Sequence, residues 1–146
     1  MSNITIHDAL KNTLGKWGSR NFIYTRTGNE FMAKTFEKTV YDIWALAEGL
    51  LDLGLADKHI MIYGENSYEW AVSDLAVMGY VGVVVAANKE WKERELENTI
   101  NIADIECVIY SNTKKDIIEN IKQKFDVKYI SMQDVFLPCL KKDMNC

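Results

Sequence analysis

The sequence has very little proline and no long apolar run. Proline occurs once, at Pro138, while 48% of the residues are hydrophobic and 26% are charged. This composition is typical of globular proteins and excludes disordered and fibrous classes. The N-terminal stretch "MSNITIHDALKNTL" lacks the charged-then-apolar pattern of a signal peptide, and no run of about 18 apolar residues follows anywhere. We therefore expect a globular protein with no membrane span and no export signal.

Cysteines are also few and scattered. Cys107, Cys139 and Cys146 are odd in number and have no CxxC spacing, so the sequence predicts neither a disulfide framework nor a zinc site. A reducing cytoplasm is the expected location.

An excess of positive charge is missing as well. The 17 Lys and Arg residues are outnumbered by 21 Asp and Glu residues, and the formal net charge is -4. No basic cluster has the density that binding to a phosphate backbone needs, so nucleic acid is not an expected partner. The length suits a single domain over residues 1–146, with 132–146 as a poorly ordered tail because Pro138 interrupts its last helical pattern.

The first third of the sequence predicts a helix, a hairpin and a second helix. Thr5 can cap a helix that runs to about Leu14, and "FIYTRTGNEFMAKTF" reads as two extended runs around "TGNE". From Phe36 to Leu51 apolar residues recur at helical spacing, and Gly54 stands where a left-handed C-cap is wanted.

Beyond Gly54 the pattern alternates between strands and helices. The apolar runs "HIMIYG", "VGVVVAAN", "ECVIYS" and "VKYIS" are separated by helical patterns at about 67–79, 91–103 and 113–124. Such alternation predicts an α/β fold with a mostly parallel, doubly wound sheet, in addition to the N-terminal β-hairpin. Since the runs are continuously apolar, we expect strands that are covered on both faces.

One helix start is predicted in more detail. Asn66 with Glu69 three positions later fits an N-cap and its capping partner. The face expected to pack on the sheet consists of Trp70, Ala71, Leu75 and Met78.

Open parallel sheets bind ligands at the carboxyl ends of their strands, but the loops expected there are poor in reactive groups. "YGENS" lacks the glycine triplet of a dinucleotide site, and Gly79 and Gly82 precede a strand instead of joining strand to helix. "SNTKK" at 111–115 follows a strand and could hold phosphate, but it has no glycine. We interpret it as a capped helix start with a solvated lysine pair.

Isolated titratable residues give no clear catalytic set. His7 is predicted on a surface helix and His59 at a strand start, and neither has a nucleophile nearby in the sequence. Asp74 and Asp104 could pair as acid and base only if the fold joined them, and we expect them to face solvent or to cap helices.

The four tryptophans favour packing over a binding platform. Trp44 and Trp70 lie on stripes that face the predicted core, Trp17 follows the first helix, and Trp91 opens a helix where an exposed ring could belong to an interface.

The order of these elements resembles the N-terminal region of the AMP-forming acyl-CoA synthetase, or adenylate-forming ligase, superfamily. The resemblance spans about residues 20–131 and is closest to long-chain fatty-acid ligases. Its markers are the "LGL" turn at 53–55, the helix start with Asn66, Ser67, Glu69 and Trp70, and the strand with its exit at 82–88. Ala86 and Ala87 replace the proline and leucine usual at that exit.

For a complete enzyme, the resemblance implies activation of a carboxylate with ATP and Mg²⁺ to an acyl-adenylate, followed by thioester formation with coenzyme A. The family's phosphate loop, adenine segment, ribose-binding aspartate and C-terminal lid lysine have no counterpart in residues 1–146. We therefore assign no catalytic, cofactor-binding or metal residue and no cofactor to this chain.

Three hypotheses follow. The first is an N-terminal fragment of an AMP-forming fatty acyl-CoA synthetase that is inactive alone. The second is a non-catalytic interaction module that forms a homodimer or pairs with the missing C-terminal portion of the ligase. The third, permitted by topology, is a small nucleotide-binding protein of flavodoxin-like type.

Overall fold

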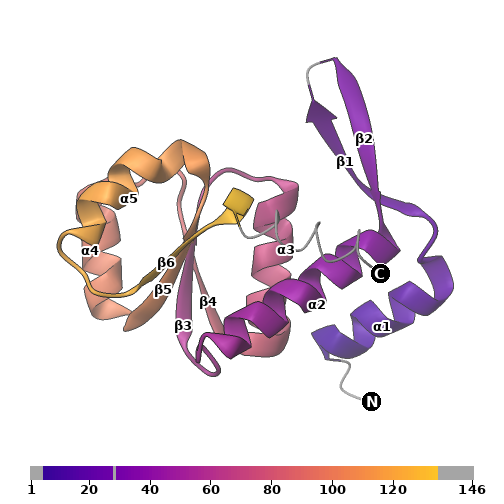
Figure 1. Cartoon of the computed structure of the whole chain (residues 1–146), viewed down its shortest axis with the longest axis horizontal. Coiled ribbons are helices and arrows are strands. Elements are labelled where there is room, and N and C mark those ends of the chain that lie inside the picture. The colour runs from indigo at the N-terminus through magenta and orange to yellow at the C-terminus, as the bar shows by residue number, and fades with distance from the viewer. Residues whose placement is uncertain (1–4, 28, 135–146) are drawn as a thin grey trace.

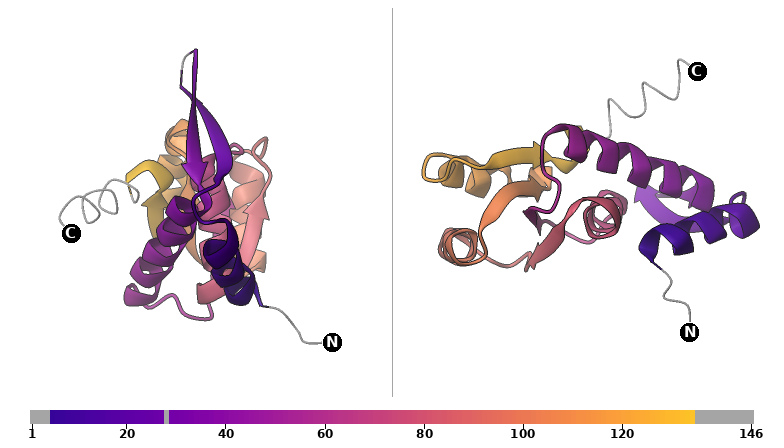
Figure 2. Two further views of the ribbon diagram at one scale, coloured as in Figure 1. Left: turned by 90° about the vertical axis from the view of Figure 1, so that its right-hand side faces the viewer. Right: turned by 90° about the horizontal axis from the view of Figure 1, so that it is seen from below.

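The computed structural model describes residues 5–27 and 29–134, which form a sheet body and an N-terminal arm (Figure 1). The arm comprises one helix and a hairpin. The sheet body comprises a parallel sheet and the helices on its two faces. Figure 2 shows the hairpin projecting away from the body.

The arm begins with α1 (Ile6–Trp17). The Thr5 hydroxyl accepts a hydrogen bond from the Asp8 N–H at 3.1 Å, and the Asp8 carboxylate accepts one from the Thr5 N–H at 3.3 Å, which confirms the predicted cap. The helix continues past the predicted end at Leu14 because a lone glycine, Gly15, costs only about 1 kcal/mol.

The predicted hairpin is confirmed. It consists of β1 (Asn21–Thr27) and β2 (Glu30–Thr35), which pair antiparallel. Helix α2 (Phe36–Asp52) follows directly, and the Thr35 hydroxyl caps it by accepting from the Lys38 N–H at 3.1 Å. Just after this helix, Gly54 adopts φ +79°, the left-handed conformation expected from the sequence.

The sheet is parallel and has the strand order β4-β3-β5-β6. Its strands are β3 (His59–Tyr63), β4 (Val83–Ala87), β5 (Ile105–Tyr110) and β6 (Lys128–Ser131). The central strands β3 and β5 are almost fully buried, whereas β4 and β6 at the edges are partly exposed. The predicted α/β class is thereby confirmed, and coverage of both faces applies fully to the two central strands.

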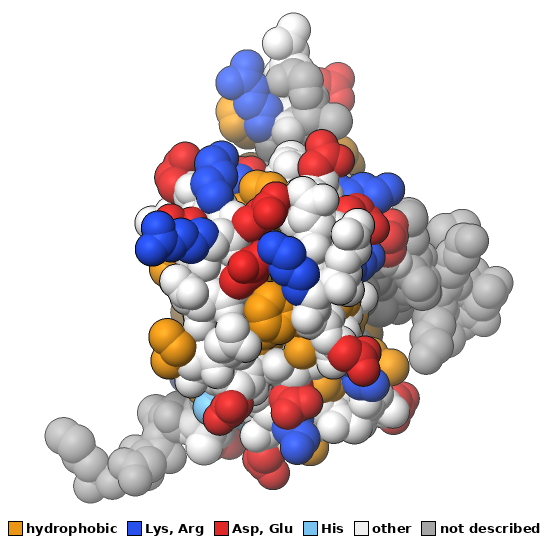
Figure 3. All heavy atoms as spheres, turned by 90° about the vertical axis from the view of Figure 1, so that its left-hand side faces the viewer, with side chains coloured by type: hydrophobic (Ala, Val, Ile, Leu, Met, Phe, Trp, Pro, Cys, Tyr) orange, Lys and Arg blue, Asp and Glu red, His pale blue; other side chains and the backbone are white. Residues whose placement is uncertain are grey.

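Helices cover both faces of the sheet (Figure 2). Helix α3 packs with α2 on one face, while α4 and α5 pack on the other. The bounds of these elements are α3 (Tyr68–Ala76), its π-helical continuation η1 (Val77–Val81), α4 (Glu93–Ile102), the 3₁₀ turn η2 (Asn112–Lys114) and α5 (Lys115–Lys122). On the outer face of α4 and α5, acidic and basic side chains are interspersed (Figure 3), as in the ion pair between Lys124 and Glu97 at 2.6 Å.

The predicted start of α3 is wrong by one residue. Ser67, and not Asn66, is the N-cap, because its hydroxyl accepts from the Trp70 N–H at 3.0 Å. This start turns Tyr68 into the core, where its hydroxyl donates to Asp42 on α2 at 2.6 Å.

The predicted packing face of α3 is also shifted. Its buried residues are Tyr68, Val72, Ser73 and Ala76. Trp70 and Leu75 pack at the margin of this cluster, and Met78 is 48% exposed. Met78 points outward because the wider π turn that begins at Val77 changes the helical period.

Gly82 is required where β4 approaches the preceding turn. A Cβ added there would lie 2.2 Å from the Lys58 carbonyl oxygen, which accepts a hydrogen bond from the Val83 N–H. At the C-terminal end, Met132 is buried, and residues 135–146 of the predicted tail, with Pro138, lie outside the described residues. Within the described ranges, no helix combines the length and apolarity that crossing a bilayer requires.

Candidate functional site

The carboxyl ends of the parallel strands bring polar side chains together, at the edge where open α/β sheets bind ligands. Glu65 follows β3, and Thr113 and Lys114 follow β5. The Thr113 hydroxyl donates to Glu65 at 2.6 Å, and the Lys114 ammonium lies 3.6 Å from the same carboxylate. The hydrogen bond from Thr113 and the nearby Lys114 charge hold the pKa of Glu65 below its usual value.

Lys114 is not the solvated lysine that the sequence predicted. Its ammonium donates to the Lys89 carbonyl oxygen at 2.7 Å, in addition to the Glu65 contact, and its side chain is only 16% exposed. Because this charge is already compensated by a carboxylate, it is poorly available to a phosphate. Lys115 is exposed, as predicted.

The other polar groups at this edge of the sheet form hydrogen bonds with one another. Ser131 donates to the Asn112 side-chain oxygen at 2.7 Å, and the Asn112 N–H donates to the Gln133 side chain at 3.0 Å. Gly64 and Ser111 stand so close that a Cβ on Gly64 would lie 2.7 Å from the Ser111 Cβ. Across residues 5–27 and 29–134, no buried side-chain nitrogen or oxygen lacks a partner. The strand ends thus form a satisfied polar network.

The two histidines make structural contacts. His7 Nδ1 lies 2.8 Å from the Tyr80 hydroxyl, which also accepts from Trp44 Nε1 at 2.6 Å. His59 Nδ1 lies 2.6 Å from the Ala103 carbonyl oxygen. His7 is exposed on α1 and His59 is the first residue of β3, the positions predicted from the sequence.

The carboxylates of Asp74 and Asp104 are not brought together. Asp74 lies on α3, and burial raises its pKa. Asp104 is exposed in the turn after α4, with φ 51°, and α3 and α4 cover opposite faces of the sheet. Cys107 is buried in β5, and burial raises the pKa of its thiol to about 12, so it is not a poised nucleophile. In the described part of the chain, no group of three or more His, Cys, Asp or Glu residues could hold a metal ion.

Three of the four tryptophan side chains pack against the hydrophobic core. Trp44 and Trp70 lie against the cluster on the α2 and α3 face. Trp91 precedes α4 instead of opening it, and its ring packs on the opposite cluster, so it forms no exposed platform. Trp17 is 44% exposed, with the Arg20 guanidinium 4.5 Å from its ring centroid.

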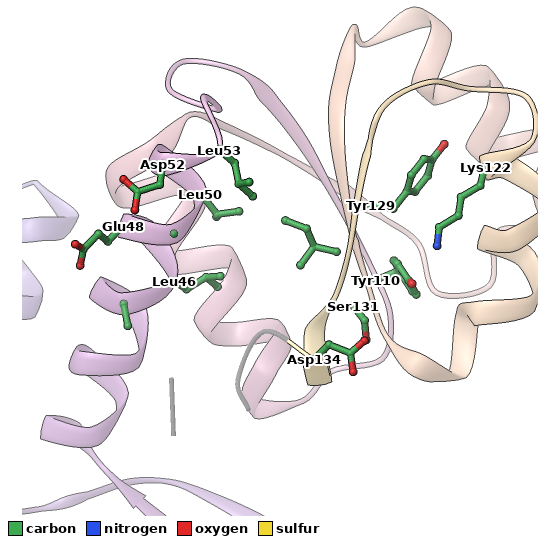
Figure 4. A pocket seen from close by; sticks show the side chains of 13 residues that line it. Leu46, Glu48, Leu50, Asp52, Leu53, Tyr110, Lys122, Tyr129, Ser131 and Asp134 are labelled. Atoms are coloured by element: carbon green, nitrogen blue, oxygen red, sulfur yellow. The ribbon is translucent and has the colours of Figure 1, made fainter. Parts of the chain in front are cut away.

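A groove between α2 and the edge strand β6 was missed by the sequence reasoning (Figure 4). Its volume is about 800 Å³, within the range of about 300–1,000 Å³ that is usual for binding sites. Its walls are formed by Ala45, Leu46, Glu48, Gly49, Leu50, Asp52, Leu53, Tyr110, Lys122, Tyr129, Ile130, Ser131 and Asp134. The small residues Ala45 and Gly49, one helical turn apart, are the one signal of this groove in the sequence.

Comparison with known proteins places this fold in a family. The profile of the AMP-binding enzyme family matches residues 13–142, and the chain belongs to that family. Luciferin 4-monooxygenase of Photinus pyralis is 34% identical over 97 residues, which cover 65% of this chain and 17% of that protein. The chain therefore spans much less than the full length of this relative.

Solved structures confirm the fold of an adenylate-forming N-terminal portion. An anthranilate CoA ligase with bound anthranoyl-AMP has a TM-score of 0.77 at 18% identity, covering 92% of this chain and 27% of the other. A long-chain-fatty-acid-CoA ligase from Archaeoglobus fulgidus has a TM-score of 0.79 at 17% identity, covering 92% of this chain and 30% of the other. The N-terminal domain of FACL13 from Mycobacterium tuberculosis has a TM-score of 0.79 at 18% identity, covering 91% of this chain and 35% of the other. Ligases of different substrates are thus about equally similar in fold.

Proposed function

We propose that this chain is the N-terminal part of an ATP-dependent, AMP-forming fatty acyl-CoA synthetase of the cytoplasm. In a complete enzyme of this type, the substrate carboxylate attacks the α-phosphorus of ATP and releases pyrophosphate. The thiol of coenzyme A then attacks the acyl carbonyl and displaces AMP. The observation that carries the proposal is the family match over residues 13–142, on a fold that agrees with N-terminal portions of such ligases.

We further propose that the chain alone does not catalyse adenylation. Transfer of the adenylyl group needs hydrogen-bond donors around the phosphates and a cation, such as the Mg²⁺ that accompanies ATP, near the developing charge. At the carboxyl edge the lysine nearest to such a role, Lys114, is already engaged by Glu65 and by the Lys89 carbonyl oxygen. We infer that the remaining groups of a complete site lie outside residues 1–146.

The test is an assay of the purified chain with ATP, Mg²⁺ and fatty acids, in which hydroxylamine traps the acyl-adenylate as a hydroxamate. We expect no hydroxamate and no pyrophosphate above a mock preparation from the same host. ATP-dependent hydroxamate that disappears in Lys114→Ala but persists in the matched variant Lys115→Ala would contradict the proposal, because contaminating host ligase would respond to neither substitution.

A second candidate is a non-catalytic interaction module that associates with itself or with a chain that supplies the remaining subdomains. The observation in its favour is the apolar surface of the hairpin, where Tyr24, Phe31 and Met32 are 63%, 69% and 54% exposed. Light scattering over a range of concentrations tests self-association. A monomer at the highest concentration would exclude the homodimer.

A further inference from the structure

A second, smaller pocket lies between α1, α2 and η1. Its volume is about 390 Å³, within the range that is usual for small-molecule sites. Its α2 wall comes from residues three and four positions apart, which share one face of the helix, and the carboxylate of Glu48 points away from the groove of Figure 4. The residues that line the pocket are His7, Trp44, Ala47, Glu48, Leu51 and Tyr80. Among these lining residues Glu48 is the one carboxylate, and none is Lys or Arg.

The aromatic walls of this pocket are held by hydrogen bonds and by the core. The Tyr80 hydroxyl accepts from Trp44 Nε1 at 2.6 Å and lies 2.8 Å from His7 Nδ1. The rings of His7 and Tyr80 are nearly perpendicular, with an interplanar angle of 83°, and both Trp44 and Tyr80 pack against the core cluster. Tyr80 belongs to the π-helical η1, a rare kind of turn that frequently occurs at functional sites. Rings fixed in this way lose little freedom when a ligand binds.

The pocket lacks the internal cation that other aromatic rings of the molecule have. The Arg20 guanidinium, for example, covers the ring of Trp17. Within the part of the chain that the structure describes, no Lys or Arg lies over the rings of Trp44 or Tyr80. In the same residues, Glu48 forms neither an ion pair nor a hydrogen bond. Two electron-rich rings and a carboxylate therefore meet here without a compensating positive charge.

The lining of the pocket selects among possible cations. A primary ammonium has three N–H donors that need acceptors, but the Tyr80 hydroxyl is already engaged and only the Glu48 carboxylate remains. A quaternary ammonium needs no hydrogen bond, and its methyl groups can contact both the ring faces and the apolar side chains of Ala47 and Leu51. A ligand that also carried a carboxylate would be repelled by Glu48. These features favour a quaternary ammonium without an anionic group.

We propose that the pocket between α1, α2 and η1 binds a small quaternary ammonium cation. The methylated nitrogen contacts the faces of Trp44 and Tyr80 at less than about 6 Å from the ring centroids, the range of cation–π interactions. The Glu48 carboxylate at the rim balances the positive charge. This site is separate from the carboxyl edge of the sheet, so the inference does not depend on ligase activity.

The test is a titration of the protein with choline, followed by heteronuclear NMR at constant ionic strength and at about pH 8, above the ordinary titration range of histidine. The indole N–H signal of Trp44 should shift saturably, with a dissociation constant of about 1 mM or lower. The indole signal of Trp17 should not shift, because Arg20 already covers that ring. The neutral isostere of choline, in which a tert-butyl group replaces the trimethylammonium group, should bind about fivefold more weakly. Betaine, which adds a carboxylate, should also bind about fivefold more weakly.

Two variants of α2 provide a matched pair. Glu48→Gln removes the charge at the rim and should weaken choline binding by about threefold. Glu37→Gln is the same substitution in the first turn of the helix, about 16 Å away along its axis, and should leave binding unchanged. Both side chains are exposed, so neither substitution should disturb the fold, and circular dichroism verifies this. The neutral isostere tests the proposal without any substitution.

Three results would overturn the proposal. The first is no saturable shift of the Trp44 signal up to about 20 mM choline, well above the expected dissociation constant. The second is equal affinity for the neutral isostere, which would reduce the site to an apolar pocket. The third is an equal loss of affinity in Glu48→Gln and Glu37→Gln, which would indicate a general attraction by the net negative charge of the protein.

Discussion

The sheet body and the N-terminal arm differ in how they are held. In the body, β3 is buried from Ile60 to Tyr63 and has a partner strand on each side. In the arm, α1 has no buried residue, and β2 is exposed from Glu30 to Ala33. The body resembles the interior of a complete domain, while the arm keeps much of its apolar surface in solvent. A marginally stable two-stranded hairpin of this kind gains most from contacts beyond itself.

The arm is attached to the body by aromatic contacts and by Leu10 and Ile23, which pack against the core cluster. Phe22 of β1 stacks on Phe36 of α2 with ring centroids 4.4 Å apart. His7 of α1 meets Tyr80 edge to face, with ring centroids 5.3 Å apart. Substitutions in the arm should therefore affect stability much less than comparable substitutions in the body.

The largest effect is expected from truncating a core side chain. Ile62→Ala should lower the free energy of unfolding by about 2–5 kcal/mol, because it leaves a cavity between the sheet and its helices. Phe31→Ala, in the exposed hairpin, should change it by no more than about 0.5 kcal/mol. Urea titration followed by tryptophan fluorescence measures both. Comparable losses would mean that the arm and the body do not differ in this way.

A smaller loss of stability is expected when a buried hydroxyl group is removed. Tyr68→Phe removes the hydrogen bond to buried Asp42, which also accepts from Lys38 at 2.7 Å, and should cost about 1.5–3 kcal/mol. Tyr24→Phe in the hairpin is the control and should be nearly neutral, since its hydroxyl has only a 3.4 Å contact with Asn21.

Ionisation of Tyr68 should make the stability of the protein depend on pH. Burial, and then the hydrogen bond to Asp42, raise the pKa of Tyr68 above its ordinary value. The unfolded chain therefore loses this proton first, and stability should fall as the pH rises above about 10. Urea titrations at neutral and alkaline pH should show a smaller loss in Tyr68→Phe than in the unchanged protein. An equal loss in both would exclude this contribution.

The smallest effect is expected at two helix caps. Hydrogen bonds with Thr5 lower the pKa of Asp8, and backbone hydrogen bonds lower the pKa of Glu95 on α4. The stabilisation from each lowered pKa is fully present above the pKa that the group has in the unfolded chain. It is lost as the pH falls through the pKa that the group has in the folded protein. Between about pH 5 and about pH 3, the protection of amides against hydrogen exchange, measured relative to their intrinsic rate at each pH, should fall in α1 more than in α4, which Leu96 and Ile100 hold to the core.

The controls for this prediction are single amide substitutions. Asp8→Asn should make the protection of amides in α1 nearly independent of pH over this interval, and Glu95→Gln should do the same for the smaller change in α4. An equal loss of protection in both helices would show that core contacts do not protect α4 as proposed.

Local chemistry made much of the fold predictable. Thr5 and Gly54 perform the capping roles that their residue types favour, and the four apolar runs form the four parallel strands. The choice between Asn66 and Ser67 could not be made locally, because both residues are good caps. It depends on Tyr68 reaching Asp42 on another helix.

The functional surfaces were harder to predict for a related reason. "SNTKK" identified Lys114, but its partner Glu65 lies far away in the sequence and meets it only because parallel strands end at one edge. The outward turn of Met78 required the π-helical segment, which apolar periodicity does not reveal. The groove beside β6 arises from the packing of α2 against the sheet, and only Ala45 and Gly49 hint at it.

The strand order also has a consequence for biosynthesis. The central strand β3 leaves the ribosome first among the four, β4 then adds on one side, β5 on the other, and β6 outside β5. The nascent sheet therefore grows outward from its middle, and no strand has to be inserted between two that are already paired. Once β4 has paired, each later strand adds on the β5 side, and within the described residues the outer edge of β4 stays unpaired, so the growing edge is the one whose transient exposure changes during translation.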